Sequence, residues 1–196
     1  MAVPSQLNLL RPETPLSDGV VALRPWTLAD VGALVTAIDG DGEIARWLEL
    51  IPQPYREAEA RAWVERATTG WGEGTMAAFA SFDVDGGTLA GGIGVEVKDA
   101  AHAVVEVGYW AACAARGRGV TTRAVRLVSR WALEQVGAER VQLLAERENL
   151  ASQRVAEKAG FVREGVLRST RFNPRLGRRM DFVMYSMLPS DPPNAG

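Results

Sequence analysis

The stretch that decides the fold of this 196-residue chain is residues 115–122, which read Ala115-Arg116-Gly117-Arg118-Gly119-Val120-Thr121-Thr122. It lies between a predicted strand, residues 104–111, and a predicted helix, residues 120–136. Its two glycines permit positive φ angles and let backbone N–H groups come close to a ligand. The helix start adds unpaired N–H groups and the positive end of the helix dipole, and two arginines add full charges. This combination suits a pyrophosphate group. A basic turn with two glycines and no ligand would have the same sequence pattern.

Two familiar phosphate-binding motifs are excluded at this stretch. The sequence contains no GxxxxGK[ST], so the stretch is not a P-loop. The dinucleotide-binding pattern GxGxxG is incomplete, because Thr122 stands where the third glycine would be. A phosphate site at this stretch would therefore be of a different kind from those of P-loop and dinucleotide-binding proteins.

The order of predicted elements indicates an α+β domain. Residues 1–19 hold three prolines and no clear period, so we expect an irregular N-terminal arm, followed by one domain over residues 20–188 and a flexible tail over 189–196. Within the domain, residue spacing predicts strands at 20–25, 76–84, 89–97, 104–111, 141–145, 162–168 and 181–188. Helices are predicted at 28–38, 44–48, 56–68, 120–136 and 152–159, with Gly160 closing the last of them.

Composition narrows the class of protein. With 47% hydrophobic and 23% charged residues, the chain reads as one globular domain. The longest charge-free stretch has ten residues, about half of what a membrane-spanning helix needs. No secretory signal is visible at the N-terminus, so we expect a cytoplasmic protein. The single Cys113 and single His102 exclude an internal disulfide and a Cys/His metal cluster, and we expect no metal.

Charge divides the chain at Cys113. Residues 1–113 carry a net charge of −9 and residues 114–196 a net charge of +7. An acidic half attracts amines and a basic half attracts polyanions, unless folding intermingles the two halves. Five arginines between 168 and 179 allow a nucleic-acid binder as an alternative, but few aromatic residues accompany them to stack on bases. We therefore expect neither nucleic acid nor membrane as a partner.

Around the glycine loop, the chain resembles the GNAT N-acetyltransferases, and within them the ribosomal-protein branch typified by RimJ and RimL. The family signature Gln/Arg-x-x-Gly-x-Gly/Ala reads Arg116-Gly117-Arg118-Gly119-Val120-Thr121 here, so that Thr121 departs from the pattern. The resemblance covers about residues 20–188. It also rests on flanking segments in the expected order: Leu23-Arg24-Pro25-Trp26, Glu106-Val107-Gly108-Tyr109-Trp110, Asn149-Leu150-Ala151-Ser152, Val155 to Phe161, Glu164-Gly165 and Asp181 to Ser186.

The resemblance implies a GNAT fold and acetyl-CoA as the acyl donor. The fold is a mixed, mostly antiparallel sheet of about seven strands with helices on both faces, in which the fourth and fifth strands splay apart. The pantetheine arm enters that gap, and the pyrophosphate binds the loop at residues 116–121. Asn149 would bond the pantetheine or steer the acceptor, unless it is an ordinary turn residue. The residues that the resemblance assigns to acetyl-CoA are Trp110, Ala111, Ala112, Cys113, Arg116, Gly117, Arg118, Gly119, Val120, Thr121 and Asn149.

Glu106 is the candidate general base. In the family the amine attacks the thioester directly, so the enzyme supplies a proton acceptor rather than a nucleophile. Glu106 matches the fourth-strand glutamate of the family and lies in an otherwise apolar strand, where apolar walls would raise the pKa of a carboxyl group. Strand alternation alone would also allow Glu106 to face solvent. Glu96 on the neighbouring strand is the rival base.

Ser152 is the candidate that protonates or hydrogen-bonds the leaving thiolate. Many family members carry a tyrosine acid at the position of Ala156, and the RimL-like branch carries a serine at the position of Ser152 instead. The alternative role for Ser152 is to cap the predicted helix at 152–159. Cys113 lies near the expected thioester channel, but no histidine partner is evident for it.

These observations predict an N-acyltransferase that moves an acetyl group from acetyl-CoA to a primary amine in a ternary complex. The acceptor would be a protein N-terminus or a small-molecule amine, and the family often forms homodimers. One alternative is a transferase that uses another acyl-CoA, such as succinyl-CoA. A second is a non-catalytic CoA-binding regulatory module.

Overall fold

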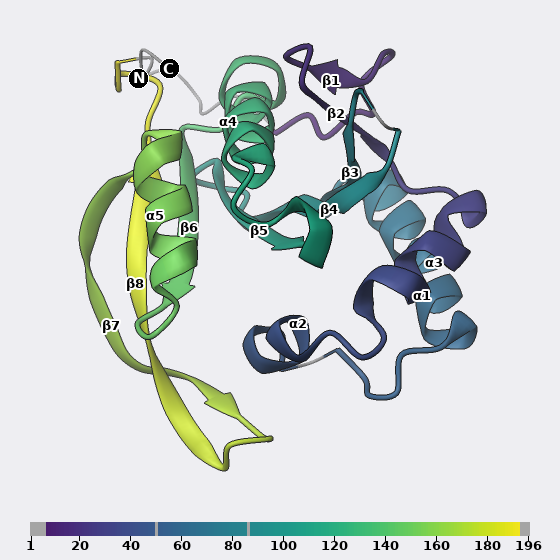
Figure 1. Ribbon diagram of the computed structural model, residues 1–196. Coiled ribbons are helices and arrows are strands. Elements are labelled where there is room, and N and C mark those ends of the chain that lie inside the picture. The colour runs from purple at the N-terminus through teal and green to yellow at the C-terminus, as the bar shows by residue number, and fades with distance from the viewer. Residues whose placement is uncertain (1–6, 50, 86, 193–196) are drawn as a thin grey trace.

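A single twisted sheet organises the computed structural model, which describes residues 7–49, 51–85 and 87–192 (Figure 1). The strand order in the sheet is β1-β2-β3-β4-β5-β6-β8-β7. The strands are β1 (Leu16–Ser17), β2 (Val21–Pro25), β3 (Met76–Asp83), β4 (Leu89–Asp99), β5 (Val104–Ala111), β6 (Arg140–Glu146), β7 (Val162–Asn173) and β8 (Arg178–Met187). The α-helices are α1 (Val31–Ile38), α2 (Gly42–Trp47), α3 (Glu57–Glu73), α4 (Val120–Trp131) and α5 (Leu150–Ala159).

The sheet confirms the predicted α+β class and its mixed, mostly antiparallel pairing. Every neighbouring pair is antiparallel except β5 with β6, which is parallel. The described residues form eight strands rather than about seven, because Leu16 and Ser17 pair with β2. These two residues lie in the segment expected to be an irregular arm, and a two-residue strand is too short to produce a periodic signal. Residues 193–196 of the expected tail lie outside the described residues.

Helices cover both faces of the sheet, as expected. Helices α4 and α5 pack on one face, and α1 and α3 pack on the other (Figure 1). Alternate residues of β3 therefore enter two different cores: Phe79 packs with Trp131 of α4, while Ala78 and Ala80 face the α1–α3 side. A strand buried on both faces reads as a nearly continuous apolar run, which explains the sequence of β3. None of the described helices is long and apolar enough to cross a membrane.

The β5–β6 pair confirms the splayed strands. Pairing covers only Val104 with Arg140, Val105 with Val141 and Glu106 with Gln142. After that, β5 continues to Ala111 and β6 to Glu146 along diverging paths. These strands are the fourth and fifth of the predicted set, so the gap opens where the sequence placed it.

The β7–β8 hairpin is longer than predicted. β7 runs to Asn173 and β8 begins at Arg178, whereas the sequence predicted strands at 162–168 and 181–188. Most of β7 is exposed, so it lacks the alternation of buried and exposed residues on which the strand prediction depends. The hairpin projects below the rest of the sheet (Figure 1). At its turn, Arg175 donates hydrogen bonds to the carbonyl groups of Ala45 and Ile51, at and just beyond α2.

The ion pair between Arg140 of β6 and Glu164 of β7 makes part of the stability depend on pH. Arg140 donates to both carboxylate oxygens of Glu164, at 2.7 and 2.6 Å, and the Ser186 hydroxyl donates to Glu164 at 2.7 Å. These hydrogen bonds lower the pKa of Glu164 from 4.5 to about 2, and those from Arg140 contribute the most. Because the folded pKa lies below the unfolded value, the stabilisation is present above about pH 4.5 and is lost as the pH falls toward about 2.

Glu164→Gln is therefore expected to lower Tm at neutral pH by about 2–4 °C, which corresponds to about 1 kcal/mol in a chain of this size. The effect is this small because the two side chains are 26% and 40% exposed and water screens the pair. Thermal unfolding of both proteins between about pH 7 and pH 3 measures the difference, which should shrink below about pH 4.5. A Tm difference that stays constant over this range would mean that the charge of Glu164 does not carry the effect.

Candidate active site

The glycine loop joins the end of β5 to the start of α4. Gly117 and Gly119 have φ angles of +74° and +78°, a left-handed conformation that other residues rarely adopt. A Cβ atom built at either position meets nothing within 4 Å, so backbone conformation and not lack of room requires the glycines. Gly119 is the N-cap of α4, and the N–H groups of the first helical turn have no acceptor within the helix. Two glycines at positive φ and a helix N-terminus, the backbone features on which the phosphate-site prediction rests, therefore lie together here.

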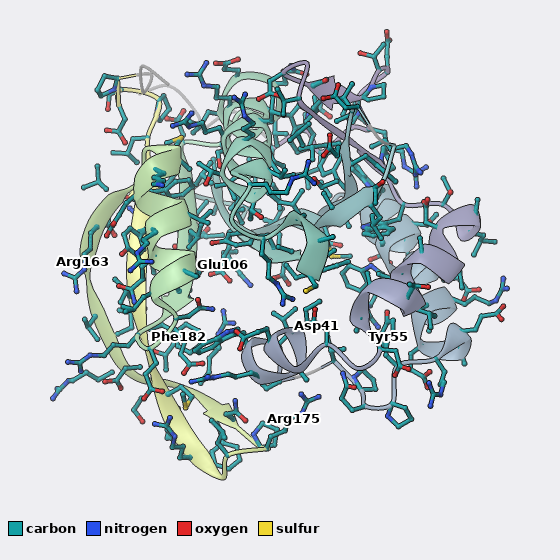
Figure 2. The ribbon with its side chains drawn as sticks, viewed as in Figure 1. Asp41, Tyr55, Glu106, Arg163, Arg175 and Phe182 are labelled. Carbon is teal, nitrogen blue, oxygen red and sulfur yellow. The ribbon has the colours of Figure 1, made fainter. Side chains whose placement is uncertain are left out.

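The two loop arginines are held by carboxylates. Arg116 pairs with Asp41 at 2.5 Å and also donates to the Ala111 carbonyl at 3.1 and 3.2 Å. Arg118 pairs with Asp83 at 2.5 Å. Asp41 is the N-cap of α2 (Figure 2), so Arg116 ties the loop to that helix. The sequence predicts that both arginines add charge for a pyrophosphate, and the structure shows that each also pairs with a carboxylate in the N-terminal half of the chain.

The end of β5 borders the gap, as the resemblance implies. Beyond Glu106 the strand has left its register with β6, so its edge is open to a ligand that extends along it. The Trp110 ring stacks on Trp26 with centroids 6.4 Å apart. Ala112 donates to the Ala90 carbonyl at 2.9 Å, and Cys113 is exposed next to the loop. The predicted pantetheine residues thus lie between the gap and the glycine loop.

Glu106 does not face open solvent. Its side chain is 12% exposed, and its two carboxylate oxygens accept hydrogen bonds from Gln142 at 3.0 Å and Arg171 at 3.1 Å. Lys98 lies 3.7 Å away. The prediction that apolar walls surround Glu106 is wrong. Strands β4, β6 and β7 bring polar and cationic groups to this carboxylate. Such surroundings fix the position of the carboxylate at the point where β5 and β6 separate.

Glu96, the rival base, lies directly across from Glu106 in the β4–β5 register. Its side chain is 59% exposed and pairs with Lys98 at 2.6 Å. Both carboxylates line the same cavity. Glu106 is the more enclosed of the two, which favours it as the positioned base.

Ser152 lies in the first turn of α5 and is not its cap. The Asn149 side chain caps the helix by accepting from the Ser152 N–H at 3.0 Å. The Ser152 hydroxyl is thereby available to the Tyr109 hydroxyl, which lies 2.8 Å from it. Capping was the alternative role for Ser152, based on a predicted helix start at residue 152, and it is wrong because α5 starts at Leu150 with Asn149 as its N-cap. Asn149 therefore has a structural role at this site.

Tyr109 is a candidate functional residue that sequence reasoning missed. It projects from β5 across the gap to α5, where its single proton can go to the Ser152 hydroxyl, at 2.8 Å, or to the Ser152 carbonyl, at 3.2 Å. Burial raises the pKa of Tyr109 to about 12. The hydrogen bond with Ser152 acts in the opposite direction and offsets only part of this rise. The phenol therefore keeps its proton near neutral pH. Ala156, where many family members have a tyrosine, is fully buried, so a phenol reaches this region from β5 instead.

A cavity of about 590 Å³ lies on the α1–α3 side of the sheet. Three central strands form its floor, and the register pairs Gly94 with both Ala78 and Gly108. Glu96 and Glu106 form the next row of this floor. The cavity therefore has the candidate base at one end and is partly open to solvent. Among the described residues, no group of three His, Cys, Asp or Glu side chains is arranged to hold a metal ion.

Comparison with known families supports this arrangement of sheet, loop and gap. The family model described as an acetyltransferase (GNAT) domain matches residues 21–162. The chain belongs to this family. As a GNAT protein it belongs with enzymes that use acetyl-CoA, and the glycine loop lies within the matched segment.

Known GNAT proteins of several kinds are similar to the chain. YdaF of Bacillus subtilis (strain 168), named as a candidate ribosomal N-acetyltransferase, is 34% identical over 102 residues, and the match covers 52% of this chain and 55% of YdaF. The chain thus spans about half the length of that relative. RimL, a ribosomal L7/L12 α-N-protein acetyltransferase solved with coenzyme A, superposes with a TM-score of 0.75 at 19% identity, covering 89% of this chain and 96% of RimL. MccE, a microcin C7 self-immunity acetyltransferase solved with acetyl-CoA and AMP, has a TM-score of 0.81 at 17% identity. The match covers 92% of this chain and 99% of MccE. At these identities, the two structures share the fold.

Proposed function

We propose that this GNAT protein transfers the acetyl group of acetyl-CoA to a primary amine, within a ternary complex. The observation that carries the proposal is the gap between β5 and β6, with the glycine loop at one end and the carboxylate of Glu106 at the other. The acceptor is a protein N-terminus or a small-molecule amine. The names of YdaF and RimL support the first kind of acceptor, and a cavity of about 590 Å³ supports the second.

The proposed reaction needs one proton acceptor and one proton donor. The amine nitrogen attacks the carbonyl carbon of the thioester, a C–N bond forms and the C–S bond breaks. Glu106 takes a proton from the nitrogen, directly or through a water molecule, and later releases it to solvent. The Ser152 hydroxyl gives a proton to the CoA thiolate and regains one from solvent. When Tyr109 donates its proton to the Ser152 oxygen, the serine proton is free to point at the thiolate.

Acetyl-CoA binding is the first test of the proposal. Calorimetric titration with acetyl-CoA should give saturable binding at one site, with CoA and succinyl-CoA as comparisons. Gly119→Val should weaken acetyl-CoA binding at least about tenfold, because a side chain in the left-handed conformation costs roughly 1–2 kcal/mol and distorts the loop. Gly19→Val is the matched control, since Gly19 also has positive φ and open surroundings but lies in the β1–β2 turn.

The outcomes of this titration separate the proposed donor from its alternatives. Tighter binding of succinyl-CoA would redirect the proposal to another acyl group. Binding of acetyl-CoA without turnover of any amine would favour a non-catalytic CoA-binding module. If the chain releases no heat with any of the three ligands, the glycine loop is structural and the proposal is withdrawn.

A further inference from the structure

We infer that the acceptor cavity selects amines that carry one large aromatic or branched apolar group. This inference rests on the proposed function, since it names the substrate class of the same site. It concerns the end of the cavity away from the carboxylates, for which the reaction itself requires no particular chemistry. The donor loop and the candidate catalytic groups would be the same for a small polar acceptor.

The floor of the cavity is hollow because the central strands lack side chains there. Gly94 lies between Ala78 of β3 and Gly108 of β5, so three neighbouring strands contribute at most a methyl group each along this row. A Cβ atom at Gly108 would meet nothing within 4 Å, which shows how much open space lies above that position. An acceptor group can therefore rest directly on the sheet.

The walls above this floor are mostly aromatic and aliphatic, with Glu49, Glu59 and Arg66 as the charged side chains among them. Five aromatic side chains line the cavity: Trp26, Tyr55, Trp63, Tyr109 and Trp110. Leu34, Ile38, Leu48, Ile51 and Met76 add aliphatic surface to these rings. A volume of about 590 Å³ is that of a site for a drug-sized ligand and exceeds what the side chain of a small N-terminal residue fills. A small polar acceptor would leave most of this apolar surface in contact with water.

Charge orients the acceptor within the cavity. Glu96 and Glu106 lie side by side on the floor, at the end where the reaction is proposed to occur, and Arg171 pairs with Glu106 there. An amine attracted to this carboxylate end directs its other end along the glycine row, toward Trp26 and Trp110. The cavity thus offers one polar end for the nitrogen and one apolar end for the body of the acceptor.

The wall formed by the segment after α2 is held in place from two sides. Arg175 on the β7–β8 hairpin donates to the carbonyl of Ile51, and Figure 2 shows this side chain extending from the hairpin toward the α2 segment. Arg116 of the glycine loop pairs with Asp41 at the start of α2. Such ties pre-organise a cavity, so that its shape can discriminate between ligands.

The direct test compares the wild-type protein on matched amines with acetyl-CoA at saturation. The aromatic acceptors are 2-phenylethylamine and a peptide with N-terminal Phe, and the polar or small ones are ethanolamine and peptides with N-terminal Ser or Ala. We expect kcat/KM to be about 10- to 100-fold higher for the aromatic acceptors, as full burial of a Phe-sized group predicts. The ratio of kcat/KM for 2-phenylethylamine to kcat/KM for the Phe peptide shows whether the cavity prefers a free amine or a peptide N-terminus.

A filled floor provides the second test. Gly108→Leu should reduce the preference for aromatic acceptors at least about tenfold, because the new side chain occupies the space of the acceptor. Gly32→Leu on α1 is the matched control, since Gly32 also has open surroundings but does not line the cavity. Thermal unfolding confirms that both variants fold, and acetyl-CoA titration should be unchanged in both.

Two results would overturn the inference while leaving the proposed function intact: equal or higher kcat/KM for ethanolamine or the Ser and Ala peptides, or an aromatic preference that survives in Gly108→Leu. Calorimetry with 2-phenylethylamine in the presence of CoA adds a readout without turnover. If this amine releases no heat and is not acetylated, the inference fails even where acetyl-CoA binds. Failure to bind acetyl-CoA would instead defeat the proposed function.

Discussion

Glu106→Gln is expected to lower kcat by about 100- to 10,000-fold, the range that a positioned general base contributes. The substitution keeps the shape of the side chain and leaves one oxygen that can accept from Arg171, while its NH2 group can pair with Gln142 only if the Gln142 amide turns over; it removes the ability to accept a proton. Acetyl-CoA affinity should change little, because the side chain lies in the acceptor cavity and not on the glycine loop. Steady-state kinetics together with acetyl-CoA titration measure the two effects separately.

Glu96→Gln is the matched control for this experiment. It removes a carboxylate from the same row of the cavity floor, but one that is more exposed and already paired with Lys98. We expect at most about a tenfold loss in this variant, since a partly screened charge attracts the amine only weakly. The assignment of Glu106 as the base is wrong if Glu96→Gln loses more kcat than Glu106→Gln, or if kcat of Glu106→Gln matches that of the wild type.

Ser152→Ala is expected to lower kcat by about 100-fold or more, because it removes the proposed proton donor to the thiolate. Tyr109→Phe alone should cost less, about tenfold, since it leaves the serine in place but deprives it of a hydrogen-bond partner 2.8 Å away. In the double variant, Tyr109→Phe should add almost nothing, because its effect is exerted through Ser152. Kinetics of the two single variants and the double variant form the required cycle.

The cycle distinguishes a positioning role of Tyr109 from a purely structural one. A structural role predicts equal losses from Tyr109→Phe with and without Ser152, together with a lowered Tm. The pKa of about 12 adds a second check, since ionisation of Tyr109 should produce no limb in the pH–rate profile below about pH 11. Full activity in Ser152→Ala would remove this residue from the mechanism.

Much of the fold could be predicted because local pattern and global arrangement agree. The strand at 104–111 and the loop at 116–119 carry their own signals, an apolar run followed by glycines that the backbone requires at positive φ. The long β7–β8 hairpin could not be predicted, because its exposed residues give no alternation of burial. The strand at Leu16–Ser17 was missed because it exists only through its pairing with β2.

The candidate site divides in the same way. The resemblance to the family pointed to Glu106 and Ser152 as candidates, and each lies on an element that the sequence predicted. Their partners come from distant parts of the chain: Tyr109 and Ser152 are 43 residues apart, and Arg171 follows Glu106 by 65. No periodicity predicts which side chains meet across such separations. The pairing of Arg116 with Asp41 is hidden for the same reason.

The most direct test of the central claim is acetyl transfer itself. The purified chain is mixed with acetyl-CoA and 2-phenylethylamine, and mass spectrometry follows the amine while a thiol reagent follows free CoA. We predict equal amounts of N-acetylated amine and free CoA, at a rate that Glu106→Gln lowers about 100-fold or more. Saturable binding of acetyl-CoA without acetylation of this or any other amine in the panel, from ethanolamine to the Ser, Ala and Phe peptides, would contradict the account.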